Sequence, residues 1–192
     1  MTKKRKPESE MMSYGYDPHL SEGAAKTPLF QTSTFIFKNS EEGKAHFHIA
    51  YGLRKKRKNE SVSLAYSRIN NPNAEIVEER LKIWDNAEAC AVFQSGMAAI
   101  TTTILEITKP NTLIMHSSPL YGGTDHFMKH ILPKYGIHSM YFDSFDTIDK
   151  IINKKNKKYP NLEVSLVYIE SPANPTNSLV DIKKSKEIAN YF

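Results

Sequence analysis

The sequence predicts an α/β domain with a mostly parallel sheet, preceded by an extended N-terminal arm. In the second half of the chain, short apolar runs alternate with helical patterns, which favours parallel strands covered by helices. Strands are expected over residues 90–93, 112–115, 139–142 and 165–169. Helices are expected over residues 97–107, 124–132, 147–153 and 182–192.

The first part of the chain has a different character. Residues 26–37 are predicted to be extended, because Pro28 disfavours a helix before it and β-branched and aromatic residues dominate. Such an arm packs either on its own core or on another subunit. We therefore expect an N-terminal arm with loops for subunit contacts over residues 1–65, and the beginning of the α/β domain over residues 66–192.

Two helices are expected before the first predicted strand. A short helix over residues 41–48 follows Ser40, which is a suitable N-cap. A longer helix starts at Ala74, with Asn73 as the expected N-cap.

Composition narrows the class of protein. The chain has 192 residues, of which 40% are hydrophobic and 24% charged, which suits a globular protein with a real core. The lone cysteine, Cys90, excludes an internal disulfide and fits a reducing compartment, so we expect a cytoplasmic protein. No apolar run is long enough to cross a membrane, and no metal-ligand pattern occurs.

The net charge of +5 raises the alternative of a nucleic-acid binder. Half of the cations, 13 of the 26 lysines and arginines, lie in three clusters at residues 3–6, 54–58 and 154–158. No aromatic interleaving or nucleic-acid motif accompanies them. Solvated loops and a disordered tail are the better interpretation, and no nucleic-acid partner is expected.

One strand-to-helix turn has the chemistry of a phosphate site. Residues 90–93 are predicted to be a buried strand tip, and Ser95 follows at the N-cap position of the next helix. The N–H groups of Gly96 and Met97 then have no helical partner and point at one place. A Cβ at Gly96 would keep an anion away from the backbone. Taken alone, an ordinary strand-to-helix turn explains the same residues.

Two later loops follow predicted strands and would gather at the same edge of the sheet. Tyr121 lies on a glycine-flanked turn where its ring could face a flat ligand. Asn174 lies between Ala173 and Pro175 in a rigid segment that fixes its amide. Each also has a purely structural interpretation, as a tyrosine packed over strand ends and as a proline-rich connection.

Four motifs, in order, resemble the Cys/Met-metabolism family of pyridoxal-phosphate enzymes. This family includes cystathionine γ-synthase, cystathionine lyases and methionine γ-lyase. The motifs are Tyr66-Ser67-Arg68 with Asn71-Pro72, Ser95-Gly96-Met97-Ala98-Ala99, Tyr121-Gly122-Gly123-Thr124, and Glu170-Ser171-Pro172-Ala173-Asn174-Pro175-Thr176. The resemblance covers the chain from about residue 14 to its end.

The resemblance implies an incomplete fold-type I, aminotransferase-like domain that binds pyridoxal 5'-phosphate. The turn of Ser95, Gly96 and Met97 would hold the cofactor phosphate. Tyr121 would stack on the pyridine ring and take part in proton transfer, and Asn174 would hydrogen-bond the 3′-oxygen of the ring.

The resemblance also implies a homo-oligomer, typically a dimer of dimers. Tyr66 and Arg68 would reach the cofactor phosphate of the neighbouring subunit, where the planar guanidinium grips phosphate in a bidentate way. A complete site would then exist only in the assembly.

The sequence departs from the family after its last motif. In the family, the ring-nitrogen aspartate and the Schiff-base lysine follow the Asn-Pro-Thr segment, but only 16 residues follow Thr176 here. Lys183, Lys184 and Lys186 lie on an expected helix rather than at a strand end. We therefore expect a truncated chain without that lysine. The substrate implied is a sulfur amino acid, in a β- or γ-elimination or a γ-replacement. The alternative is a non-catalytic remnant that at most associates with an intact homologue.

Overall fold

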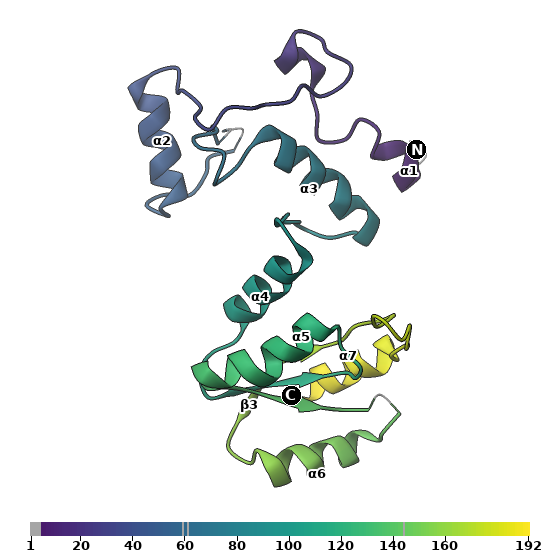
Figure 1. The fold of residues 1–192 in the computed structure, drawn as a ribbon. Coiled ribbons are helices and arrows are strands. Elements are labelled where there is room, and N and C mark those ends of the chain that lie inside the picture. Colours follow the sequence, from purple (N-terminus) through teal and green to yellow (C-terminus); the bar gives the residue numbers. More distant parts are fainter. Residues whose placement is uncertain (1–4, 59, 61, 144) are drawn as a thin grey trace. The chain divides into compact units, whose positions relative to one another are not determined.

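The computed structural model describes residues 5–58, 60, 62–143 and 145–192. The chain forms two compact units, one reaching to Val92 and the other comprising Phe93–Phe192 (Figure 1). The predicted division into residues 1–65 and 66–192 concerns subunit contacts and remains a prediction.

The second unit is built on a parallel sheet, as predicted. Its strands are β1 (Thr112–His116), β2 (Ile137–Tyr141) and β3 (Glu163–Tyr168), in the spatial order β2-β1-β3. The central strand β1 is parallel to both neighbours, and its register with β3 shifts between Leu113 and Ile114. The five residues of β1 are all buried. Burial on both faces is typical of a parallel strand covered by helices.

Helices cover both faces of this sheet (Figure 1). On one face lie α4 (Gly96–Ile107) and the run formed by α5 (Gly122–His126), η2 (Phe127–Ile131) and η3 (Leu132–Tyr135). On the other face lie α6 (Ile148–Lys158) and α7 (Ile182–Tyr191). The alternation of β1 explains the two cores, because Ile114 packs in the first cluster while Leu113 and Met115 pack in the second.

The expected helix over residues 124–132 becomes three short elements. Its middle turn, η2, is π-helical and η3 is a 3-10 turn. Pro133 has no N–H and cannot continue an α-helical ladder, and Gly136 closes the run with φ +72°. The helical character of residues 124–132 was predicted correctly, but the regularity of the helix was not.

The prediction of a strand over residues 90–93 is wrong. Residues 89–93 belong to no strand, and the side chains of Val92 and Phe93 are exposed by 43% and 38%. The sheet of the described residues contains β1, β2 and β3 alone. The Val92 N–H donates instead to Glu78 Oε1 at 3.0 Å. The segment is extended, but no neighbouring strand among the described residues pairs with it.

The first unit contains α1 (Pro7–Glu10), η1 (Pro18–Ser21), α2 (Ser40–Ala50) and α3 (Pro72–Asp85). Two predicted caps need correction. Helix α2 begins at Ser40 with Asn39 as its N-cap, and α3 begins at Pro72 with Asn71 as its N-cap. Proline suits the first helical position because the missing N–H would have no partner there, so α3 starts two residues early.

The N-terminal arm is extended, as expected, and it pairs with the chain ahead of α3. Thr34 and Tyr66 form an isolated antiparallel bridge. The Phe35 N–H donates to the Ala65 carbonyl at 3.0 Å, and the Ser67 N–H donates to the Ser33 carbonyl at 2.9 Å. No helix in the described ranges is long and apolar enough to cross a membrane.

Candidate functional site

The turn into α4 has the predicted geometry. Ser95 Oγ accepts the Ala98 N–H at 3.1 Å and caps the helix. The N–H groups of Gly96 and Met97 have no acceptor among the described residues. A Cβ added at Gly96 would meet nothing within 4 Å. The positive end of a 12-residue helix therefore has two backbone donors without an acceptor among the described residues, and the space for a side chain at Gly96 is empty; both features suit an anion.

Tyr121 lies beside this turn. A Cβ added at Gly123 would be 2.7 Å from Cε1 of the Tyr121 ring and 2.8 Å from the Met97 sulfur. The ring and the thioether therefore both lie against Gly123, where no larger residue fits without moving one of them. The Tyr121 side chain remains 44% exposed. The structure thus brings the second predicted loop to the first.

The third loop is joined to the second through Glu170. The Tyr121 N–H donates to Glu170 Oε2 at 2.5 Å, and the Tyr168 hydroxyl donates to Glu170 Oε1 at 3.0 Å. The Glu170 N–H donates to Ser117 Oγ at 3.2 Å. Glu170 belongs to the fourth motif, but the sequence alone indicates no role for its carboxylate. The available signal was its place directly after a predicted strand, at the edge where the loops gather.

Burial and Glu170 together change the acidity of Tyr168. Burial, followed by the hydrogen bond to the Glu170 carboxylate and its negative charge, raises the pKa of Tyr168 to about 12. A weaker effect from the Thr124 hydroxyl lowers this pKa. Tyr168 therefore stays protonated at neutral pH and acts as a hydrogen-bond donor.

His116, at the end of β1, stays neutral for a similar reason. Its pKa is lowered mainly by burial, against the opposing effect of its 2.7 Å hydrogen bond with the Ser117 carbonyl. The ring therefore contributes no positive charge to this edge of the sheet at neutral pH.

Asn174 is less constrained than the other predicted residues. It is exposed, next to the buried Ala173, in a turn where the Asn177 N–H donates to the Ala173 carbonyl at 2.7 Å. Its amide makes no hydrogen bond within the part of the chain that the structure describes. Its contact with a cofactor remains a prediction.

Tyr66 and Arg68 belong to the first unit and lie next to each other. The Arg68 guanidinium carbon is 5.6 Å from the centroid of the Tyr66 ring, and both side chains are exposed. Asn71 holds the segment between them, because its Nδ2 donates to Ser67 Oγ at 2.9 Å and to the Phe30 carbonyl at 3.2 Å. Arg68 forms no ion pair with any described residue. The pair is therefore free to meet an external anion.

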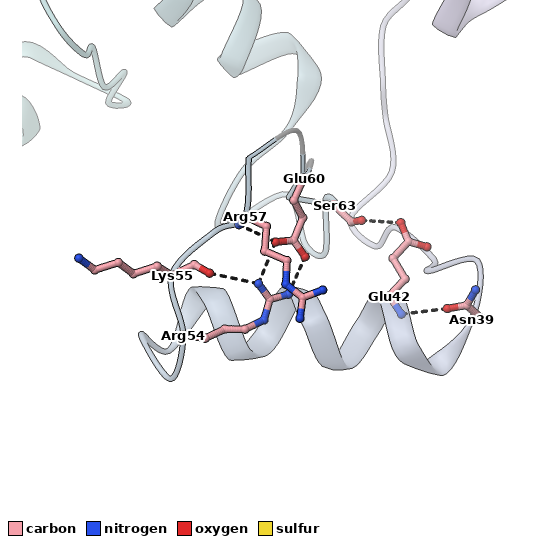
Figure 2. Close-up of polar contacts among 7 residues, drawn as sticks. All are labelled: Asn39, Glu42, Arg54, Lys55, Arg57, Glu60 and Ser63. Carbon is pink, nitrogen blue, oxygen red and sulfur yellow. Dashed lines mark hydrogen bonds and ion pairs between the residues drawn. The ribbon is translucent and has the colours of Figure 1, made fainter.

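The basic stretch before Tyr66 is more ordered than expected. Figure 2 shows the Arg54 guanidinium on the Glu60 carboxylate, with the Arg57 N–H donating to Glu60 Oε2 at 2.9 Å. Arg54 lowers the pKa of Glu60 to about 2. Ser63 Oγ donates to Glu42 Oε1 at 2.5 Å and ties the end of this stretch to α2 (Figure 2).

The remaining cations of that stretch are solvated, as predicted. They are Lys55, Lys56, Arg57 and Lys58. Metal binding has no support in the described ranges, where no group of three or more histidine, cysteine, aspartate or glutamate side chains is placed to hold an ion.

Comparison with known proteins gives the same assignment as the motifs. The model of the Cys/Met metabolism PLP-dependent enzymes matches residues 8–191. L-Methionine gamma-lyase from Treponema denticola is 35% identical over 167 residues, covering 87% of this chain and 38% of the lyase. Cystathionine gamma-synthase 1 of Arabidopsis thaliana is 31% identical, covering 86% of this chain and 27% of the synthase. The chain thus spans well under half the length of these relatives.

The fold is shared with a solved structure from Campylobacter jejuni. It is described as an O-acetylhomoserine (thiol)-lyase and contains N'-pyridoxyl-lysine-5'-monophosphate. The TM-score is 0.80 at 22% identity, covering 98% of this chain and 42% of that one. This likeness shows the fold, a fold-type I α/β architecture, and the sequence match supplies the family. The chain belongs to the Cys/Met-metabolism family of PLP-dependent enzymes, whose relatives here act in sulfur amino acid metabolism.

Proposed function

We propose that this chain provides the first part of a pyridoxal-phosphate site for β- or γ-elimination, or γ-replacement, on a sulfur amino acid. One observation carries the proposal. The ring of Tyr121 and the Met97 sulfur both lie against Gly123, so Tyr121 lies beside the helix start whose Gly96 and Met97 N–H groups have no acceptor among the described residues. In such folds, ligands bind where the strands of a parallel sheet end. The family match supplies the cofactor and the sulfur chemistry.

The residues fit the cofactor in charge and shape. The phosphate would accept from the Gly96 and Met97 N–H groups, over a position where even a Cβ meets nothing. The flat face of Tyr121 would cover the pyridine ring, and the Asn174 amide would bind the 3′-oxygen. When bound, the cofactor supplies an electron sink for carbanion charge. The chain's own contribution is to hold the ring in one plane, and the Tyr121 hydroxyl would move a proton at the ring face.

The lysines near the end of the chain are poorly placed for covalent capture of the cofactor. Lys183, Lys184 and Lys186 lie on α7, and Lys155 lies on α6. Both helices pack on the face of the sheet opposite to α4 and α5. The proposal therefore includes no Schiff-base lysine from these helices.

Tyr66 and Arg68 would complete the phosphate site of a second subunit. The arm holds them in an exposed position, and Arg68 keeps its guanidinium unpaired within the described ranges. This arrangement supports a homo-oligomer, for which the family resemblance implies a dimer of dimers. The free thiol of Cys90 suits a reducing, cytoplasmic setting.

The phosphate turn can be tested with a proline at its first helical position. Gly96→Pro removes one N–H donor but suits the start of a helix. Ile182→Pro is the matched control, since Ile182 begins α7 and its side chain is 63% exposed. We expect Gly96→Pro to weaken pyridoxal-phosphate binding about tenfold or more, as befits a lost charge-assisted hydrogen bond, and Ile182→Pro to leave it unchanged. Equal affinities in the two variants and the unsubstituted chain would reject the site.

A further inference from the structure

We infer that Glu170 is the positioning residue for Tyr121, fixing the cofactor-stacking ring over the phosphate turn through the Tyr121 backbone. The inference rests on the proposed function, because the ring matters only if a flat ligand binds there.

Both oxygens of the Glu170 carboxylate are engaged, each by a different donor. Oε2 accepts the Tyr121 N–H at 2.5 Å and Oε1 accepts the Tyr168 hydroxyl at 3.0 Å. Hydrogen bonds to an ionised carboxylate are shorter and stronger than those between neutral groups. The carboxylate therefore joins the loop after β1 to the end of β3 across 49 residues of sequence.

The β3 side of this link is anchored to the sheet. The Glu170 N–H donates to Ser117 Oγ at 3.2 Å, and the Ser117 N–H donates to the Tyr168 carbonyl at 3.0 Å. Ser117 is only 2% exposed. The backbone of Glu170 is therefore fixed relative to the sheet, and its side chain holds the loop that carries Tyr121.

The link sets where the Tyr121 ring lies. Glu170 holds the backbone N–H of Tyr121, and the edge of the Tyr121 ring lies against Gly123, two residues further along the chain. The Met97 sulfur lies against the same glycine, 2.8 Å from the position of an added Cβ. If the hydrogen bond from the Tyr121 N–H to Glu170 is lost, the Tyr121 backbone is no longer held in place, although the ring can still contact Gly123.

The test uses the 192-residue chain with three substitutions. Glu170→Ala removes both acceptors. Glu170→Gln keeps a single acceptor oxygen for two donors, since the other amide position can only donate. Glu163→Gln is the matched control, because Glu163 is an exposed glutamate at the start of the same strand.

The first readout needs no cofactor. Hydrogen exchange at the Tyr121 amide should accelerate about tenfold or more in Glu170→Ala, and by an intermediate factor in Glu170→Gln, as a lost hydrogen bond to a charged group requires. Exchange at the buried Ile114 amide of β1 should stay constant, as should both amides in Glu163→Gln. An equal acceleration at Tyr121 and Ile114 would mean that Glu170 only stabilises the fold, and would overturn the inference.

The second readout uses pyridoxal phosphate itself. A ring held by a fixed aromatic face acquires induced circular dichroism in its absorption band. We expect this signal, per bound cofactor, to fall in both Glu170 variants and to persist in the control. An unchanged signal with accelerated Tyr121 exchange would overturn the positioning role. If the unsubstituted chain binds no cofactor while the exchange results hold, the proposed function fails but the Glu170–Tyr121 link stands.

Discussion

The Arg54 guanidinium spans both carboxylate oxygens of Glu60, with Nη2 to Oε1 at 2.5 Å and Nη1 to Oε2 at 2.8 Å. This fork-to-fork pair closes the loop between α2 and the segment that carries Tyr66 (Figure 2). The side chains are about a quarter exposed, so water screens the pair only in part. The loop therefore approaches Tyr66 in a defined shape, although it is rich in cations.

The order of this loop should depend on acidic pH. The pKa of Glu60 is lowered from 4.5 to about 2, chiefly by Arg54 and then by the Arg57 N–H. A depressed carboxyl pKa stabilises the folded loop above the unfolded value of 4.5, and this stabilisation is lost as the pH falls towards 2. We expect the Glu60 carboxyl carbon to titrate near 2 by NMR. Glu60→Gln should abolish the pH dependence of loop order, and titration near 4.5 would contradict the ion pair.

Adjacent glycines offer a matched pair for the Tyr121 site. A Cβ at Gly123 would lie 2.7 Å from the Tyr121 ring and 2.8 Å from the Met97 sulfur, whereas a Cβ at Gly122 meets nothing within 4 Å. Gly122→Ala should be neutral or stabilise by up to about 1 kcal/mol through helix propensity. Gly123→Ala should destabilise by about 1 kcal/mol or more through overpacking, and should weaken pyridoxal-phosphate binding. Denaturant unfolding measures the stability of each variant, and cofactor titration measures its affinity. Similar values for Gly122→Ala and Gly123→Ala would show that a Cβ at Gly123 does not crowd the Tyr121 ring.

The assembly prediction follows from the exposed Tyr66–Arg68 pair. If Arg68 serves the phosphate of a neighbouring subunit, Arg68→Ala and Gly96→Pro damage opposite partners of one shared site. Mixing the two weakly binding variants should therefore restore the original pyridoxal-phosphate affinity in about a quarter of sites, because half of randomly mixed dimers are hybrids with one intact site each. Recovery is measured by cofactor titration of co-refolded chains. A mixture that binds no better than either variant would place Arg68 in its own subunit's site or outside the site altogether.

The solvated cations of the basic loop should bind nucleic acid only weakly. Lys55, Lys56, Arg57 and Lys58 are exposed, whereas Arg54 is neutralised by Glu60. Phosphate contacts alone give binding that falls steeply with salt. Replacing these four residues by glutamine should reduce residual DNA or RNA binding, measured by fluorescence anisotropy, and leave cofactor binding unchanged. Sequence-selective binding that persists at physiological salt would favour nucleic-acid binding over pyridoxal-phosphate chemistry as the function.

Features that depend on neighbouring residues were predictable from the sequence. Ser95 caps α4 because its hydroxyl reaches the N–H three residues on, and no other part of the chain is needed. The caps of α3 show the limit of this reasoning. Asn71 and Asn73 both have the right chemistry, and the fixed φ of Pro72 selects the earlier one.

Features that depend on distant partners were not predictable. The extended run around Val92 looks like a strand in isolation, but a strand also needs a partner strand, and the Val92 N–H donates to the Glu78 side chain instead. The contact between Glu170 and Tyr121 has the same origin, because it joins two loops that meet only once the sheet has formed. Local patterns identify such residues as candidates, while the sheet decides which of them touch.

The 192-residue chain should not capture pyridoxal phosphate on one specific lysine. Covalent capture requires an amine that is partly deprotonated at working pH, but an ordinary exposed lysine, with a pKa of about 10.4, is protonated at pH 7 and is a weak nucleophile. The lysines of α6 and α7 lie on the face of the sheet away from α4 and α5. We expect borohydride reduction in the presence of the cofactor, followed by peptide mapping, to show scattered and substoichiometric labelling of lysines. We also expect no turnover of cystathionine or methionine. The matched substitution Lys183→Arg should leave the labelling pattern otherwise unchanged. Stoichiometric labelling of one lysine, together with elimination from a sulfur amino acid, would show that this chain holds a complete catalytic site.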